Sequence, residues 1–134
     1  MHEFTDSPHI YGNHFFPDFM EWLKFISLCI KKTDYEWYLK LHPMATSITN
    51  ELGVKFANEN KIKILDKNFS NRLLAKYNID YALTVCGTIS SELPFYRIKV
   101  VNASKNTPYS KFNFSITPKN KNVRGYTHLA SQYD

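Results

Sequence analysis

The sequence is poor in cysteine and glycine and has no long apolar run. Its 134 residues include two cysteines, Cys29 and Cys86, and four glycines. Two cysteines outside any paired motif are too few for a disulfide framework or a zinc site, so we expect a reducing compartment. The apolar runs fall far short of the roughly 20 residues that a membrane-spanning helix needs, and the N-terminus lacks a secretory signal. A soluble, cytoplasmic protein is therefore expected.

Motifs of several enzyme classes are missing as well. The sequence contains neither a P-loop nor a Gly-x-Gly-x-x-Gly motif, which argues against a nucleoside triphosphatase or a dinucleotide oxidoreductase. Its five histidines show no two-ligand spacing on a shared element. We expect neither a bound metal nor a resident cofactor.

The chain does contain enough apolar material for one compact core. Hydrophobic residues make up 43% of it and aromatic residues 16%, while 22% of the residues are charged. This composition argues against intrinsic disorder, and the length fits one domain of the usual size of roughly 100–150 residues.

Charge is distributed unevenly along the chain. The formal net charge is +5, yet residues 1–36 carry six acids against three bases, and residues 93–133 carry seven bases and no acid. Such a basic stretch suits a nucleotide diphosphate, an anionic glycan, nucleic acid or an anionic membrane surface. A merely solvated basic face is the alternative.

Apolar periodicity predicts alternating helices and strands. Helices are expected over 17–32, 46–58 and 68–77, with a fourth beginning near Gly87, and strands over 35–41, 61–65, 81–85 and 98–102. This alternation favours right-handed βαβ units, and so an α/β fold with a doubly wound, mostly parallel sheet of about four to five strands and helices on both faces. Beyond Asn102 we expect loop with at most one short element, in which the aromatic residues form a packed edge.

The segment after the third strand is the first candidate site. A glycine at the strand exit, Gly87, permits a sharp turn, and Thr88, Ser90 and Ser91 supply hydroxyls beside the N–H groups of a helix N-terminus, which together suit phosphate oxygens. Glu92 suits the hydroxyls of a sugar or ribose better than phosphate. The alternative is that these residues only form the turn and the helix cap.

The second candidate is His42, which follows the first strand. A loop stiffened by Pro43 holds this histidine at the carboxyl end of the strand, where it can donate to a phosphate oxygen. The alternative is an ordinary structural histidine. Both candidate segments lie at the edge where parallel α/β sheets bind ligands.

These motifs, in this order, resemble a known family. His42-Pro43, then Gly87-Thr88 leading to Ser90-Ser91-Glu92, then Lys99-Val-Val, resemble the C-terminal nucleotide-sugar-binding half of GT-B glycosyltransferases. The likeness is closest to bacterial surface-carbohydrate and capsule polysaccharide enzymes and covers roughly residues 6–118. The loop after the last strand lacks the glycine-proline ending of that family, and its final helix is missing.

The resemblance implies a Rossmann-like domain over 17–118, preceded by an interdomain linker remnant over 1–16 and followed by a polar tail over 119–134. It implies that His42 contacts the phosphates of a nucleotide-activated sugar and that Glu92 holds ribose or sugar hydroxyls. The phosphate loop would be lined by Gly87, Thr88, Ser90 and Ser91.

In that family the glycan acceptor and the usual catalytic base come from the N-terminal half. The chain is therefore expected to bind the donor, and no catalytic residue is assigned in it. The face that would meet the N-terminal half is expected to be apolar, so two copies of the chain can pair through it as a homodimer. Peripheral contact with the inner face of an anionic membrane is also expected from the basic stretch. Two alternatives stay open: a stand-alone, non-catalytic nucleotide- or phosphoglycan-binding module, and a basic protein that binds nucleic acid or a membrane surface. We expect no nucleic-acid partner, because the sequence contains no recognised nucleic-acid-binding motif.

Overall fold

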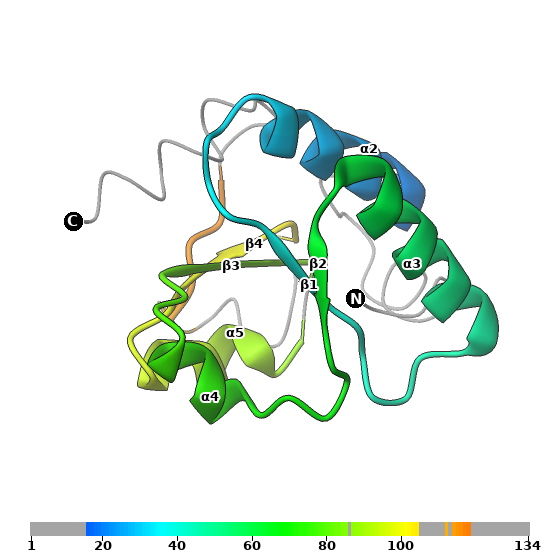
Figure 1. Cartoon of the computed structure of the whole chain (residues 1–134). Coiled ribbons are helices and arrows are strands. Elements are labelled where there is room, and N and C mark those ends of the chain that lie inside the picture. Colours follow the sequence, from blue (N-terminus) through cyan, green and yellow to red (C-terminus); the bar gives the residue numbers. More distant parts are fainter. Residues whose placement is uncertain (1–15, 86, 105–111, 113, 119–134) are drawn as a thin grey trace.

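The computed structural model describes residues 16–85, 87–104, 112 and 114–118. Helices and strands alternate along the chain from α2 onward (Figure 1). The helices are α2 (Phe19–Lys31), α3 (Ser47–Asn60), α4 (Asn71–Lys76) and α5 (Ile89–Phe95), and the strands are β1 (Tyr38–Lys40), β2 (Lys63–Leu65), β3 (Tyr81–Thr84) and β4 (Lys99–Asn102). The expected segments 1–16 and 119–134 lie almost wholly outside the described residues.

Both strand pairs are parallel, as the alternation predicts. β1 pairs with β2, with Tyr38 opposite Lys63, and β3 pairs with β4, with Tyr81 opposite Lys99. Among the described residues the strands form two separate two-stranded sheets, not the one larger sheet that we expected. The α/β class and the parallel pairing are thus confirmed, whereas a continuous doubly wound sheet is not.

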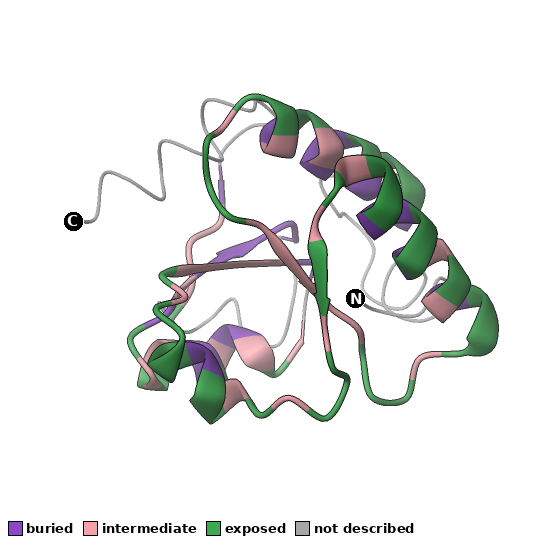
Figure 2. Cartoon of the chain, viewed as in Figure 1, coloured by how far each residue is buried: buried purple, intermediate pink, exposed green. Residues whose placement is uncertain are grey.

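Hydrophobic side chains form two clusters on opposite faces of the β3–β4 sheet. Leu83 and Val101 belong to the first cluster, while their neighbours Ala82 and Val100 belong to the second. Successive side chains of a strand point to opposite faces, so the two clusters lie on either side of this sheet. Figure 2 shows β4 as a buried strand and β2 as a largely exposed one.

Different helices cover the two faces. The first cluster takes its helical side chains from α2 and from Phe56 of α3, and the second takes Leu74 from α4 and Leu93 from α5. Helices therefore flank the β3–β4 sheet on both sides, as the sequence predicts. This layered packing leaves the ends of the strands as the places where loops gather.

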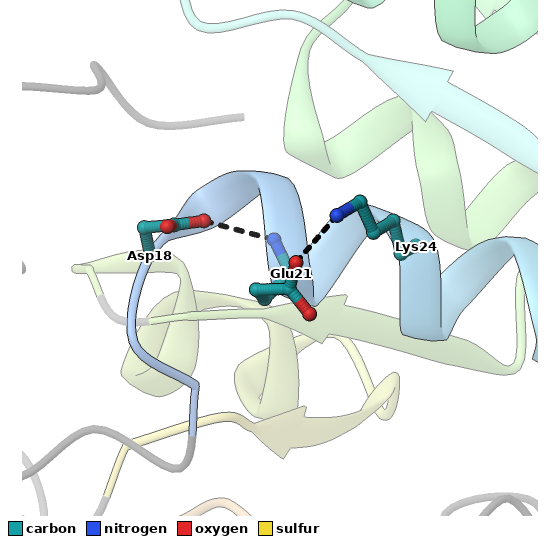
Figure 3. A network of polar contacts seen from close by, with 3 residues as sticks. All are labelled: Asp18, Glu21 and Lys24. Atoms are coloured by element: carbon teal, nitrogen blue, oxygen red, sulfur yellow. Dashed lines mark hydrogen bonds and ion pairs between the residues drawn. The ribbon is translucent and has the colours of Figure 1, made fainter.

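The first helix begins and is stabilised as its sequence predicts. The Asp18 carboxylate accepts a hydrogen bond from the backbone N–H of Glu21 at 2.9 Å, which caps the helix, and Lys24 pairs with Glu21 on the exposed side (Figure 3). The opposite side is apolar and buried. The capping bond satisfies an N–H group that has no acceptor inside the helix.

The first strand is shorter than the predicted 35–41. Its start is delayed because the preceding chain stays tied to the end of α2: the Thr33 hydroxyl donates to the Cys29 carbonyl at 2.8 Å, and the Trp37 indole donates to the Thr33 hydroxyl at 3.1 Å. These local bonds compete with strand pairing.

The structure leaves two groups of apolar side chains exposed, and for the second group this overturns the expected packed edge. On α4, Leu74 is buried, but Leu73 is 37% exposed and Tyr77, at the C-cap, is 67% exposed, because this helix has only six residues and covers the sheet with one turn. Near the C-terminus, Phe112 and Phe114 are 55% and 53% exposed and do not form a packed edge.

One short element follows β4, as expected. Ile116 forms a parallel bridge with Val101, in which the Ile116 N–H donates to Val100 and the Asn102 N–H donates to Ile116, both at 2.8 Å. The chain near Ile116 therefore runs beside β4, on the side away from β3. Across the part of the chain that the structure describes, no helix is both long and apolar enough to cross a membrane.

Candidate functional site

The turn between β3 and α5 is built around Gly87. This residue has φ 138°, in a region that side chains with a Cβ rarely allow. The chain leaves β3 after Thr84, passes the buried Val85, turns at Gly87 and enters the first turn of α5. A glycine at this position is thus required by the backbone itself.

Hydrogen bonds close the first turn of α5 directly after Gly87. The Ser90 N–H donates to the Gly87 carbonyl, and the Ser91 and Glu92 N–H groups donate to the Thr88 carbonyl, each at 3.0 Å. The first N–H groups of any helix, here those at 87–89, have no acceptor inside the helix itself. The start of α5 therefore lies directly after the turn at Gly87, close in sequence to the end of β3.

The polar side chains of this segment have different surroundings. Thr88 and Glu92 are exposed, and Thr88 makes no side-chain capping bond. The Ser91 hydroxyl donates to the Thr88 carbonyl at 2.9 Å, whereas Ser90 is 1% exposed and its hydroxyl donates to the Asn102 side chain at 2.7 Å. Direct contact between Ser90 and a ligand would have to replace that bond.

His42 is exposed in the loop after β1. Its Nδ1 accepts a hydrogen bond from the Met44 backbone N–H at 3.1 Å. This bond holds the orientation of the imidazole ring relative to the loop. The local turn, which the Ala45 N–H closes by donating to the His42 carbonyl at 3.0 Å, fixes the backbone at this position.

The two candidate segments follow strands of different sheets. His42 comes two residues after β1, and Gly87 comes three residues after β3. In Figure 1 both strands run toward the right-hand side, so their carboxyl ends face the same side of the molecule. Leu39 of β1 and Leu83 of β3 pack against the same core cluster, which keeps the two strands near one another.

The structure adds one residue to the site that the sequence did not single out. Asn102, at the carboxyl end of β4, is 1% exposed, and its side chain accepts from Ser90 and donates to the Ser115 hydroxyl at 2.5 Å. It therefore joins α5, β4 and the segment near Ile116. The available signal was a polar residue directly after the apolar pair Val100 and Val101.

A buried hydroxyl lies two residues further along. Ser104 is 1% exposed, and its hydroxyl makes no hydrogen bond in the described structure. An unpaired buried hydroxyl costs about 1–3 kcal/mol and is uncommon in folded proteins. It follows the carboxyl end of β4, next to the strand that leads into Gly87.

The described residues offer no metal centre: they contain no group of three or more His, Cys, Asp or Glu side chains that could hold an ion. What the candidate segments present instead is an exposed histidine, an exposed threonine hydroxyl at the start of a helix and an exposed carboxylate. Donors of this kind suit phosphate oxygens, and the carboxylate suits hydroxyl groups.

Comparisons with protein-family models, with curated proteins and with solved structures gave no match to this chain.

Proposed function

We propose that this chain binds the nucleotide part of a nucleotide-activated sugar, as the donor-binding half of a glycosyltransferase of bacterial surface-polysaccharide synthesis. The observation that carries the proposal is the turn at Gly87, which brings the start of α5 and the exposed Thr88 and Glu92 to the end of a parallel strand. Phosphate recognition at such a turn is a general property of α/β folds. The order of motifs supports the choice of a sugar donor.

In this proposal each residue has a distinct role. His42 contacts a phosphate oxygen, the backbone at Gly87 and the Thr88 hydroxyl bind a second phosphate oxygen, and Glu92 accepts from ribose or sugar hydroxyls. Ser90 and Ser91 line the loop and hold its shape through their bonds to Asn102 and Thr88. Donors fixed before binding lose little freedom when they meet the ligand.

We also propose that the four strands belong to one doubly wound, Rossmann-like sheet in the order β2–β1–β3–β4. The rings of Tyr35, just before β1, and Tyr81, at the start of β3, lie 6.4 Å apart between centroids. In this order the chain moves outward from β1 to β2 and then returns to β3, so the boundary between β1 and β3 is the switch point where ligands bind. His42 and Gly87 would flank that boundary.

Thermal unfolding with CMP, UDP and GDP as probes tests the binding site. A ligand that binds only the folded state at 100 times its Kd adds about 2.7 kcal/mol to stability, and so raises the Tm. We expect one nucleotide to raise the Tm of the wild type and His42→Ala and Glu92→Ala to remove that rise. Glu51→Ala, which removes an exposed carboxylate from α3, is the matched control and should keep the rise.

Two results would overturn the proposal: no nucleotide changes the Tm of the wild type, or the two site variants respond as the control does. A further measurement separates the two nucleotide-binding alternatives: release of the nucleotide from its sugar donor after an acceptor-binding half has been added. A stand-alone binding module and an isolated donor half both bind without turnover, but only the half should gain transfer activity when an acceptor-binding half is supplied.

A further inference from the structure

The strongly exposed aromatic side chains gather at one edge of the molecule. Within the described residues they are five: Tyr35, Tyr77, Phe95, Phe112 and Phe114, exposed by 50%, 67%, 84%, 55% and 53%. We call this set the aromatic rim. Three of them, Phe95, Phe112 and Phe114, are phenylalanines with more than half of their surface in water, which is costly for a side chain without any polar group.

Each member of the aromatic rim lies where the chain enters a strand. Tyr35 precedes β1, Tyr77 follows α4 and precedes β3, and Phe95 ends α5 just before β4. Phe112 and Phe114 precede Ile116, which pairs in parallel beside β4. The parallel strands β3, β4 and the segment at Ile116 begin at the same edge, so the rim residues before them lie opposite the end of β3 that leads into Gly87. Tyr35 lies beside them, because its ring contacts that of Tyr81.

Contacts between rings and cations connect parts of this edge. The rings of Phe112 and Phe114 stack with centroids 5.5 Å apart and planes inclined by 16°. The ammonium group of Lys99, at the start of β4, lies 5.6 Å from the centroid of the Tyr81 ring, and Tyr81 contacts Tyr35. Aromatic rings therefore reach from the segment before β1 to the start of β4.

The charge around the aromatic rim is mainly positive. Basic residues on the connections and strand starts are Lys32, Lys61, Lys63, Lys76, Arg97 and Lys99; acidic ones are Asp34, Glu36 and Asp80. Glu36 is already paired with Lys63 at 3.0 Å. A partner with negative charge is therefore favoured at this edge.

We propose that the aromatic rim docks on the surface of an anionic lipid bilayer. The phenylalanine rings would leave water for the boundary between headgroups and acyl chains, the tyrosines would stay at headgroup level, and the lysines and Arg97 would meet lipid phosphates. Rings carried on separate loop and helix ends along one edge meet a flat surface, whereas single-stranded nucleic acid requires a groove in which ring faces stack on bases. The opposite edge, with His42 and Gly87, would face the solvent.

Vesicle sedimentation of the full chain tests this inference. We expect binding to vesicles of mixed phosphatidylcholine and phosphatidylglycerol, weak binding to pure phosphatidylcholine, and loss of binding as salt is raised. The triple variant Phe95→Ser, Phe112→Ser, Phe114→Ser should bind at least roughly tenfold more weakly. The matched control is the triple variant Met44→Ser, Ile48→Ser, Val54→Ser, which removes apolar side chains that are 81%, 67% and 43% exposed on other surfaces; it should bind as the wild type does.

Several outcomes would overturn it. These are no sedimentation of the wild type with anionic vesicles, equal losses in the two triple variants, or a dimer in sedimentation velocity that the rim variant alone dissociates while vesicles bind neither form. Salt-sensitive binding to single-stranded DNA without vesicle binding would also overturn it. The measurement needs no nucleotide, so it stands or falls separately from the proposed function.

Discussion

The thiol of Cys29 lies fully buried in the first hydrophobic cluster, on the inner side of α2. Burial raises the pKa of this thiol from 9.0 to about 11, because the charged thiolate loses its hydration there, and nearby Lys32 offsets only part of the shift. The group is therefore held neutral in the folded state over a wider pH range than in the unfolded chain.

A pH-dependent stability follows from this shift. The folded pKa lies above the unfolded one, so the contribution of Cys29 is fully present below about pH 9 and is lost as the pH rises through about 11. We expect the wild type to be more stable than Cys29→Ala at pH 8.5, as measured by urea unfolding. This difference in the free energy of unfolding should shrink as the pH rises to about 11, because the two pKa values bound the window in which the unfolded thiol ionises and the folded one does not. Parallel pH profiles for the two proteins would contradict this.

Asn102 illustrates what a single residue can gain from tertiary structure. In the sequence it is only the polar end of an apolar strand. In the fold its buried side chain joins Ser90 and Ser115, segments that lie 12 and 13 residues away. No local pattern encodes such partners, because they are chosen by how α5 and the chain near Ile116 pack around β4.

At the scale of elements, α2 is the part of the fold that its own sequence specifies most fully. Its buried positions recur every three or four residues, a capping aspartate precedes it and Lys31 ends it. α4 and β1 depend more on their surroundings. α4 has six residues, fewer than an isolated helix needs, so packing of Leu74 on the sheet must stabilise it.

The cap of α2 gives a prediction at this scale. Asp18→Ala removes the acceptor for the Glu21 N–H and should lower the free energy of unfolding by about 1 kcal/mol. Lys24→Ala breaks the exposed ion pair with Glu21 on the same helix and should change stability very little, since both partners remain hydrated. Urea titrations of both variants test the difference; equal losses would show that the cap is not the stabilising feature.

At the scale of the whole molecule, the β3–β4 sheet belongs to both hydrophobic clusters. Alternate side chains of the same two strands pack against α2 and α3 on one face and against α4 and α5 on the other. Neither cluster can lose this sheet without exposing the other, so the two should unfold together.

This coupling predicts coincident unfolding curves. The two tryptophans, Trp22 and Trp37, both pack in the first cluster, so their fluorescence reports that face, while far-UV circular dichroism reports helices on both faces, α2 to α5 among them. We expect the two urea transitions to coincide and Val101→Ala, which shortens a fully buried side chain of the shared sheet, to shift both by the same amount. A fluorescence change at lower urea than the loss of helix would contradict a single cooperative unit.

The sequence by itself determined the order of helices and strands, the parallel pairing and the α/β class, because periodicity, caps and the glycine turn act over a few residues. Tertiary structure decided the features that depend on contacts between segments far apart in the sequence. It set the lengths of the strands, paired β1 with β2 and β3 with β4, buried Ser90 against Asn102, and left Phe95, Phe112 and Phe114 in water. These outcomes depend on which distant segments pack together, and burial of a side chain is a property of its neighbours in space rather than in the chain.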